Sequence, residues 1–416
     1  MFKCILGQLV RCITLSRNHR AQFDLGKFNM CQVQNILLLS YYVPCIGHAG
    51  GLRVLDLYRK IRELAPSVNI TLLARTDNNI DWGFDEIYEI FDEVYLVSKD
   101  DFSPSVLKRF VDGKSFDCID LQFHQSGKFV SLARNMFVNA RIIFSPLEIQ
   151  SRWLWERVRT RAVHLDLIGL IESIYLTIQE IYYANNTDLV VCVSPVDERE
   201  IKKVLPHLKS IYLPTCVPNH NPKPAEDHDI DGPERGTFNL NETLTVVYFA
   251  HWGSGENMAS LQWYIHNVHP LVKAEVFNYK LVILGRGMIS EACDKLVKDS
   301  AIELIGEIED PSAIFQRASV GISPSVIGGG MKGKIHQYAR YRLPCVASFK
   351  LGEDLLYEQG SSILFADNAG EFAEHCVKLL NNPELRNGIG DRAYDVCSKS
   401  YSWESYSADI RNIYGL

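Results

Sequence analysis

The sequence predicts an α/β protein with two doubly wound domains that face a central cleft. Three observations predict this class: short apolar runs alternate with helical patterns, the alternation occurs twice, and a proline-rich polar segment separates the two series. At 416 residues the chain exceeds the roughly 250–300 residues that one hydrophobic core usually serves. Because ligands of open α/β sheets bind beyond the carboxyl ends of the strands, a cleft between the domains is the expected site.

The first series of elements begins at Asn35–Ser40, a continuous apolar run typical of a buried parallel strand. The segment Ala49-Gly50-Gly51 follows it and opens a helical pattern that continues to Leu64. Further strands are expected over 70–74, 93–97, 118–123, 140–144 and 189–193, with long helices over 151–186 and a helix from Asp197. We therefore assign residues 31–215 to an N-terminal domain.

Residues 1–30 precede this series and differ from it. Four Lys and Arg residues and no acidic residue occur before Asp24, but the small-residue cleavage site of a signal peptide is missing. We expect a disordered extension here, and a targeting presequence is the alternative.

Residues 216–242 are rich in proline and polar residues and are expected to form a linker. A second α/β series follows, with strands expected over 244–249, 280–284, 301–305, 320–323 and 345–348 and helices over 311–318 and 370–380. Asn257 is expected to cap a helix that contains Trp263. We assign residues 243–400 to a C-terminal domain and 401–416 to a terminal helix that packs back on the N-terminal domain.

The composition argues against several classes of protein. The net charge is −7 at pH 7, whereas general affinity for nucleic acid needs a basic surplus. The 11 cysteines are scattered without a Cys-x-x-Cys pair, so we expect buried free thiols in a reducing, cytoplasmic compartment. No apolar stretch reaches the ~18 residues of a membrane span.

The most informative segment is the glycine–lysine loop, residues 326–334, which follows the expected strand 320–323. It contains three consecutive glycines, Gly328, Gly329 and Gly330, and then Lys332 and Lys334 at the start of a helical pattern. Glycines allow the backbone to approach a ligand closely, a helix N-terminus presents free N–H groups, and the lysines add charge. The combination predicts a diphosphate-binding site; solvated charges at a helix start are the alternative.

The glycine–lysine loop, continued by Leu343-Pro-Cys-Val-Ala347, resembles the C-terminal signature of retaining glycosyltransferases of the GT-B fold, family 4-like (glycosyl transferases group 1). Four further blocks resemble that family in the same order: Pro44–Arg53, Val247–Asn257, Leu281–Gly287 and Leu304–Asp310. The resemblance implies two Rossmann-like domains facing a cleft. It also implies that the C-terminal domain binds a nucleotide-diphosphate sugar and that the N-terminal domain binds the acceptor.

The resemblance implies roles for single residues as well. Lys334 is expected to stabilise the charge on the departing diphosphate, without a metal or other cofactor. His124, after a strand, is expected to lie near the reacting sugar; a structural histidine is the alternative. The remaining donor-binding residues are expected to be Gly50, Gly51, Arg286, Glu307, Gly328, Gly329, Gly330, Lys332 and Gln337.

Gly329 and Gln337 stand where many relatives have glutamates. An amide can still hydrogen-bond a ribose hydroxyl, whereas glycine cannot replace a carboxylate. The predicted function is a retaining, metal-independent glycosyltransferase acting on a glycan, a lipid-linked or a small-molecule acceptor. A nucleotide-sugar epimerase of the same fold is one alternative, although it would need acidic residues near the sugar and Gly329 argues against it. Because the glutamates are missing, a non-catalytic scaffold of polysaccharide assembly is a second alternative.

Two further segments are candidates for binding. The Arg- and Trp-rich segment 152–161 predicts peripheral contact with an anionic membrane surface, and a charged entry to a core helix is the equal alternative. The segment Asp227–Asp231 imitates a metal-binding Asp-x-Asp sequence, but its proline-rich surroundings favour a solvated acidic loop. No metal site is expected.

Overall fold

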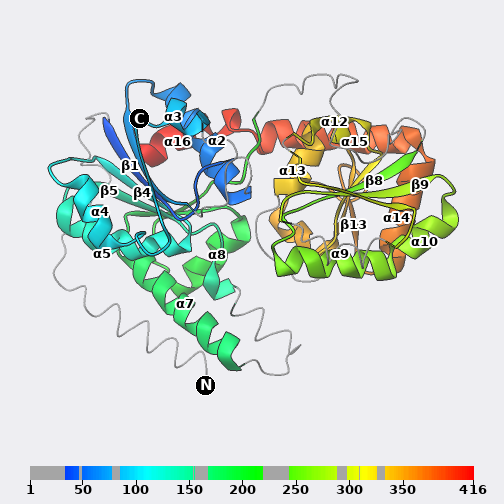
Figure 1. Cartoon of the computed structure of the whole chain (residues 1–416), viewed down its shortest axis with the longest axis horizontal. Coiled ribbons are helices and arrows are strands. Elements are labelled where there is room, and N and C mark those ends of the chain that lie inside the picture. The colour runs from blue at the N-terminus through cyan, green and yellow to red at the C-terminus, as the bar shows by residue number, and fades with distance from the viewer. Residues whose placement is uncertain are drawn as a thin grey trace. The chain divides into compact units, whose positions relative to one another are not determined.

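The computed structural model of the chain describes residues 33–45, 49–76, 85–152, 154, 167–218, 243–287, 298–308, 310–325 and 333–416. These residues form two compact units (Figure 1), of which the first ends at Pro214 and resumes over Tyr406–Leu416. The second unit spans Thr215–Ser405. Each unit contains one parallel sheet flanked by helices, which confirms the doubly wound α/β class.

The first unit has a seven-stranded sheet in the order β3-β2-β1-β4-β5-β6-β7, and all of its strand pairs are parallel. The strands are β1 (Asn35–Ser40), β2 (Asn69–Arg75), β3 (Glu93–Val97), β4 (Cys118–Gln122), β5 (Arg141–Ser145), β6 (Leu189–Cys192) and β7 (Ser210–Tyr212). The order reverses between β1 and β4. In open α/β sheets this switch point, at the carboxyl ends of the strands, is where ligands bind.

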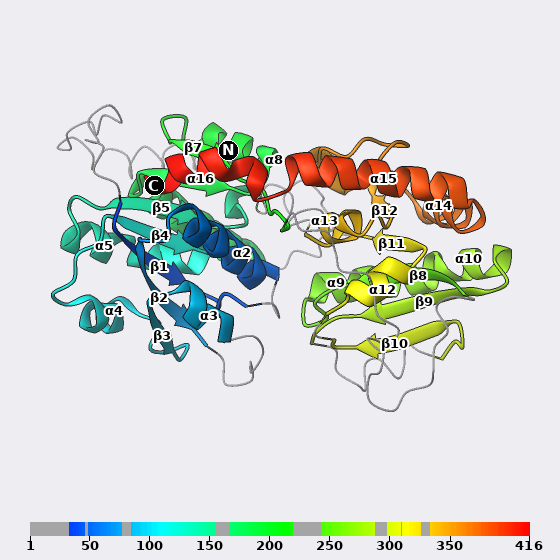
Figure 2. The same cartoon turned by 90° about the horizontal axis from the view of Figure 1, so that it is seen from above.

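Helices cover both faces of this sheet. Because side chains alternate along a strand, Ile119 and Leu121 of β4 face one layer while Asp120 faces the other. The layer around Ile119 and Leu121 includes α4 (Pro104–Val111), α5 (Val130–Met136), α7 (Leu167–Asn185) and α8 (Pro195–Val204). The layer that Asp120 faces includes α2 (Ala49–Leu64) and α16 (Ser407–Tyr414), with α3 (Asp85–Ile90) beside α2 (Figure 2).

The second unit has a six-stranded sheet in the order β10-β9-β8-β11-β12-β13, again with parallel pairs throughout. The strands are β8 (Leu244–Phe249), β9 (Tyr279–Leu284), β10 (Ile302–Gly306), β11 (Val320–Ser323), β12 (Cys345–Ser348) and β13 (Leu364–Ala366). Here the order reverses between β8 and β11. The second unit therefore repeats the arrangement of the first and has a switch point of its own.

Two hydrophobic layers sandwich the second sheet. Tyr248 of β8 packs with α9 (Gly255–Asn267), α10 (His269–Glu275) and α14 (Ala369–Asn381) on one face. Val247 of β8 packs with α12 (Ser312–Arg317), α13 (Gly333–Arg340) and α15 (Pro383–Ser400) on the other (Figure 1). The helix α9 follows β8, and α13 follows β11. Both helices therefore begin at the carboxyl edge of the sheet.

The structure adds elements that the local sequence patterns did not predict, among them the three-residue strands β7 and β13 and the helix α15. The strands are short, and α15 contains Gly388 and Gly390, which weaken a helical pattern. The helix expected from Asp197 begins at Pro195, because the Ser194 hydroxyl accepts hydrogen bonds from the N–H groups of Val196 and Asp197.

The cysteines that the structure describes are free and buried, as expected for thiols that take no part in disulfides: Cys45, Cys118, Cys192, Cys216, Cys345, Cys376 and Cys397. None of the described helices is long and apolar enough to cross a membrane.

Candidate functional site

The candidate site of the second unit lies along the carboxyl edge of its sheet, around the switch point between β8 and β11. The backbone leaves β8 into Ala250–Ser254, β9 into Gly285–Gly287 and β10 into Glu307. Beyond β11, α13 begins at Gly333. Four neighbouring strands thus direct their following residues to one edge, which brings together Arg286, Glu307 and Lys334 from distant parts of the sequence.

Glycines allow these loops to approach one another. Gly285 has φ +129°, and a Cβ added to it would lie 1.9 Å from the carbonyl oxygen of Ala250. Gly287 has φ +85°, and its added Cβ would lie 2.9 Å from the backbone nitrogen of Gly253. Side chains at these positions would be strained and would push the loops after β8 and β9 apart. Local sequence patterns do not predict this packing role of Gly285 and Gly287, because the loops that meet here are far apart in the chain.

Lys334 lies in the first turn of α13 and is half-buried. Its Nζ donates a hydrogen bond to Oδ1 of Asn257 at 3.2 Å and lies 4.8 Å from the ring centroid of Tyr248. Both partners belong to the edge around β8 and α9. The ammonium group is therefore held in a defined place by groups that orient it without cancelling its charge.

Asn257 does not cap α9, contrary to expectation. The helix begins at Gly255 after Ser254, and Asn257 lies inside its first turn. Its Nδ2 donates to the carbonyl oxygen of His251 at 2.9 Å while its Oδ1 accepts from Lys334. The amide thus connects the loop after β8 to the start of α13, a long-range role that local capping preference cannot predict.

Arg286 and Glu307, both expected to bind the donor, form an ion pair with each other: Nε of Arg286 lies 3.2 Å from Oε1 of Glu307. The carbonyl oxygen of Arg286 accepts the N–H of Trp252 at 2.7 Å, which ties the loop after β9 to the loop after β8. Burial and the Arg286 charge lower the pKa of His251 at the same edge, and Glu307 partly offsets this. His251 is therefore held in its neutral form at neutral pH.

Gln337 lies one turn after Lys334 on α13 and is half-buried, so the two side chains share a face of the helix. The adjacent His336 is a structural residue instead. It is buried, its ring stacks on Tyr401 with centroids 3.9 Å apart, and burial lowers its pKa to about 3. The other expected residues of the glycine–lysine loop, Gly328, Gly329, Gly330 and Lys332, lie outside the described residues.

In the first unit, the expected glycine pair and His124 follow the paired ends of β1 and β4, where Ser40 and Gln122 are in register. Gly50 and Gly51 lie in the first turn of α2, and Gly50 is buried. A Cβ on Gly51 would lie 2.6 Å from the carbonyl oxygen of Val43, so this glycine is required for the helix to start against its own loop.

His124 is buried at the start of the 3₁₀ helix His124–Phe129, and burial lowers its pKa. Neither of its ring nitrogens has a well-formed hydrogen bond among the described residues, although the side chain of Gln179 faces the ring. The preceding residue, Phe123, has φ +73°, a conformation that is uncommon for a bulky side chain. Strained backbone and a buried imidazole at a switch point are features of binding sites as well as of cores.

Of the two other candidate binding segments, the structure describes only part of 152–161. Arg152 forms an ion pair with Asp197 at 3.0 Å and is mostly buried, so its charge serves the first unit; Trp153 and residues 155–161 lie outside the described residues, as does Asp227–Asp231. Within the described ranges, no three or more His, Cys, Asp or Glu side chains gather in a way that could hold a metal ion.

Comparison with known proteins adds a family to this geometry. Residues 244–382 match the family model described as glycosyl transferases group 1. The matched range lies within the second unit. Lys334, Gln337, Arg286 and Glu307 all lie inside the matched range, whereas Gly50, Gly51 and His124 lie outside it.

The curated proteins that the chain matches are distant from it. An uncharacterized protein of the cps region of Klebsiella pneumoniae is 26% identical over 209 residues, covering 49% of this chain and 51% of the relative. An uncharacterized glycosyltransferase of Methanocaldococcus jannaschii is 26% identical over 145 residues, covering 33% of this chain and 40% of the relative. The chain thus spans about half or less of the length of the curated relatives that it matches.

Solved structures are similar over nearly the whole chain. Sucrose-phosphate synthase from Thermosynechococcus elongatus superposes with a TM-score of 0.72 at 14% identity, covering 92% of this chain and 98% of that one. HepE from Anabaena in complex with UDP-glucose gives a TM-score of 0.65 at 12% identity, covering 91% and 98%. These similarities confirm the GT-B fold, with a Rossmann-like sheet in each unit. The retaining, family 4-like assignment stays a prediction.

Proposed function

We propose that this protein is a glycosyltransferase that moves a sugar from a nucleotide-diphosphate sugar to a glycan, a lipid-linked or a small-molecule acceptor, with retention of configuration and without a metal. The observation that carries the proposal is the placement of Lys334, Gln337 and Arg286 around the carboxyl edge of the second sheet, inside the range that matches the glycosyl transferases group 1 model. The donor would bind at this edge of the second unit. The acceptor would bind at the carboxyl edge of the first unit, near His124.

Lys334 is the residue proposed to act on the reaction itself. Cleavage of the bond between sugar and nucleotide leaves negative charge on the diphosphate, and a fixed cation at that position stabilises the transition state more than the ground state. Asn257 and Tyr248 orient the ammonium group before the donor binds, so little reorganisation is needed during the reaction. The N-terminal end of α13 adds its N–H groups to the same charge.

The other residues are proposed to bind the donor. Gln337, one turn from Lys334, can donate to and accept from the hydroxyl groups of a ribose. Arg286 is proposed to contact a phosphate or the base, with Glu307 holding its guanidinium in place. A nucleotide-sugar donor is supported by HepE, a structural neighbour that was solved with UDP-glucose. The base, the sugar and the acceptor are chosen by pocket side chains that these contacts do not specify.

Replacing Lys334 by Ala tests the proposal. We expect a fall in donor consumption of about 100-fold or more, the size of effect that follows loss of one transition-state charge contact. Nucleoside diphosphates should raise the melting temperature of the wild-type protein. Without ligand, the variant should melt at the same temperature as the wild-type protein. Lys350→Ala, an exposed lysine of the same unit, is the matched control and should retain activity.

Other outcomes of these experiments would support the alternative functions. If no nucleoside diphosphate stabilises the wild-type protein, both enzymatic alternatives are wrong and a non-catalytic scaffold is left. If a nucleotide-sugar is converted to an isomer without any acceptor, the protein is an epimerase. Near-normal turnover by Lys334→Ala would remove this residue from the mechanism.

A further inference from the structure

The helix α7 of the first unit exposes large side chains along one of its faces. Ile171, Tyr175 and Tyr182 are 59%, 58% and 42% exposed. Residues four and seven positions apart lie on the same side of a helix, so these side chains follow one another along α7. Figure 1 shows that α7 extends well beyond the strands of its sheet. The proposed mechanism gives this face no role.

Hydrogen bonds orient the two exposed tyrosines. Nε2 of Gln179, which lies between them on the helix, donates to the hydroxyl of Tyr175 at 2.8 Å. The hydroxyl of Tyr182 lies 2.7 Å from Oγ of Ser131 on α5. Each ring is thus held at its hydroxyl end while much of its surface stays exposed to solvent. A tyrosine that is oriented in this way loses little conformational entropy when a ligand packs on it.

This face of α7 lies beside the proposed acceptor site. The side chain of Gln179 faces His124, and the ring centroids of His124 and Tyr183 are 5.7 Å apart. The 3₁₀ helix that begins at His124 packs directly on α7, since a Cβ added to Gly127 would lie 2.1 Å from the Tyr183 ring. The two exposed tyrosines are seven residues apart, which corresponds to about 10 Å along the helix axis. A ligand must therefore be longer than a single sugar ring to contact both.

The chemistry of these side chains suits a carbohydrate. A pyranose has an apolar face of C–H groups and a rim of hydroxyl groups. A tyrosine ring packs on the face, and amide and hydroxyl groups hydrogen-bond the rim. An anionic membrane surface would instead require Lys or Arg around the apolar face of a helix. The sequence of α7 contains neither, and its exposed charged residue is an acid, Glu172.

We propose that Tyr175, Gln179 and Tyr182, here called the tyrosine strip, bind the acceptor and that the acceptor is an oligosaccharide chain. The inference rests on the proposed function, because it extends the acceptor site expected at His124. It selects a glycan chain from the acceptor classes named there. The two rings stack on sugar units that do not react, and Gln179 hydrogen-bonds hydroxyl groups between them.

Binding of the full-length protein to a printed array of monosaccharides and oligosaccharides tests the tyrosine strip. Calorimetry then compares the best-bound chain with its monosaccharide unit, in the presence of the nucleoside diphosphate that gives the largest thermal shift. We expect an oligosaccharide to bind at least about tenfold more tightly than its monosaccharide unit. The double variant Tyr175→Ala/Tyr182→Ala should weaken binding of the chain about tenfold or more, as loss of two aromatic contacts does, and should leave binding of the monosaccharide unchanged.

Two variants serve as controls. Tyr175→Phe/Tyr182→Phe keeps both rings, and Tyr88→Ala removes a tyrosine of the same unit that is 61% exposed. Both should bind the chain within about twofold of the wild-type protein, since neither removes a ring of the tyrosine strip. All variants should melt at the wild-type temperature, because the side chains that change are exposed.

The proposal is overturned if the wild-type protein binds no oligosaccharide, if it binds the monosaccharide as tightly as the chain, or if the double alanine variant binds the chain normally. If the wild-type protein binds phosphatidylglycerol vesicles through these tyrosines and binds no oligosaccharide, the strip is a membrane contact and the proposal is wrong. Failure of every nucleoside diphosphate to stabilise the protein would instead reject the proposed function, so the two failures are distinguishable.

Discussion

At the scale of single residues, neighbouring side chains of α13 in the second unit have different roles: Lys334 is proposed to bind the donor, and His336 is structural. Lys334 is oriented by an amide and a ring, and both leave its charge available to an anion. His336, two residues later, is locked between Tyr357 and Tyr401 and stays neutral. Helical periodicity explains the difference, since residues two apart point to opposite sides of α13.

Glu180 provides a residue-scale prediction about pH. Its buried carboxylate accepts the backbone N–H groups of Gln150 and Ser151, yet burial raises its pKa to about 7. The folded state therefore holds this proton more tightly than the unfolded state. The free energy of unfolding should fall by roughly 3 kcal/mol as the pH rises from about 4.5 to 7, because the unfolded carboxyl ionises first.

The variant Glu180→Gln keeps a carbonyl acceptor for the two N–H groups but cannot ionise. Urea unfolding of both proteins at pH 5, 6, 7 and 8 measures the effect. We expect the variant to gain stability relative to the wild-type protein as the pH rises through this range. A difference between the two proteins that does not change with pH would show that Glu180 does not titrate there.

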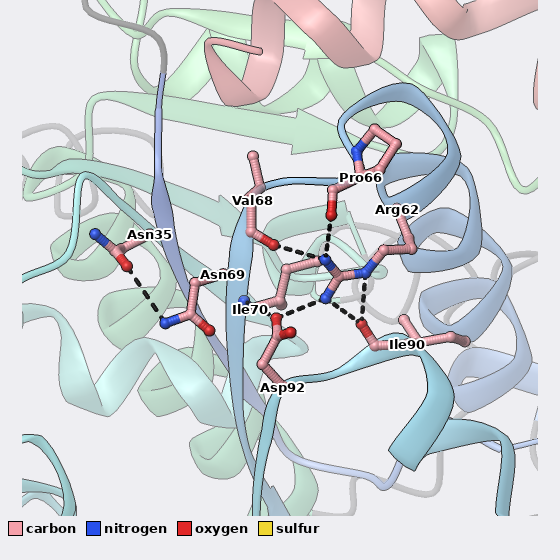
Figure 3. Close-up of polar contacts among 8 residues, drawn as sticks. All are labelled: Asn35, Arg62, Pro66, Val68, Asn69, Ile70, Ile90 and Asp92. Atoms are coloured by element: carbon pink, nitrogen blue, oxygen red, sulfur yellow. Dashed lines mark hydrogen bonds and ion pairs between the residues drawn. The ribbon is translucent and has the colours of Figure 1, made fainter.

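At the scale of elements, Arg62 connects the last turn of α2 to the turns beside it. The guanidinium of Arg62 donates to the carbonyl oxygens of Pro66, Val68 and Ile90 and to the carboxylate of Asp92, as Figure 3 shows. These groups belong to the turn before β2 and the turn between α3 and β3. Arg62 thus fixes the end of the helix whose first turn carries Gly50 and Gly51.

Asp92 completes this junction. Its carboxylate accepts the N–H of Ile70 at 2.7 Å and pairs with Arg62 at 2.6 Å. Burial alone would raise the pKa of Asp92, but the Ile70 N–H and the Arg62 charge together lower it. The stability that the carboxylate contributes is therefore present above its unfolded pKa and is lost as the pH falls through its folded pKa.

We expect Arg62→Ala to lower the free energy of unfolding of the first unit by about 2–3 kcal/mol, because several partly buried carbonyl groups lose a charged donor. Arg62→Lys should recover only part of this loss, since an ammonium group cannot reach acceptors in the planar fork that a guanidinium spans. Arg109→Ala, an exposed arginine of α4, is the matched control. Equal stability of Arg62→Ala and Arg109→Ala in chemical denaturation would contradict this account.

At the scale of the whole molecule, the chain returns to the first unit after completing the second. The Tyr414 hydroxyl donates to Oδ2 of Asp120 at 2.7 Å, and the same oxygen accepts from Tyr58 at 2.9 Å. The guanidinium of Arg141 donates to the carbonyl oxygen of Asn412 at 2.7 Å. Residues that are far apart in the chain thus share one core, and α16 is part of the first unit.

Tyr414→Phe should therefore destabilise the first unit specifically. Loss of one of the donors to a buried carboxylate costs about 1–3 kcal/mol. In differential scanning calorimetry, the transition of the first unit should move to lower temperature while the transition that a nucleoside diphosphate stabilises stays in place. Tyr88→Phe, an exposed tyrosine of the same unit, is the control. A shift of both transitions, or of neither, would refute the assignment of α16 to the first core.

Local sequence patterns predicted the continuous apolar strands well, but they missed the two shortest strands and the helix α15, whose glycines weaken its pattern. The apolar runs at Asn35–Ser40 and Leu244–Phe249 coincide with β1 and β8, because a strand buried on both faces needs an uninterrupted apolar run. The strands β7 and β13 have three residues each and are too short for a pattern to be recognised. The helix cap predicted at Asn257 is wrong, because the preference of asparagine for caps is a local property and does not reveal its distant partner, Lys334.

The sequence by itself determined the class of the protein: two parallel α/β sheets, a glycine–lysine loop where an anion is expected, and the order of blocks that resembles the GT-B glycosyltransferases. The spacing of apolar residues, the length of apolar runs and the positions of glycines are local properties. They can be recognised without knowing which segments of the chain contact each other. Only the tertiary structure decided which side chains share a site. The pairing of Lys334 with Asn257 and of Arg286 with Glu307 depends on strand order, because parallel strands that are far apart in the chain bring their carboxyl ends to one edge.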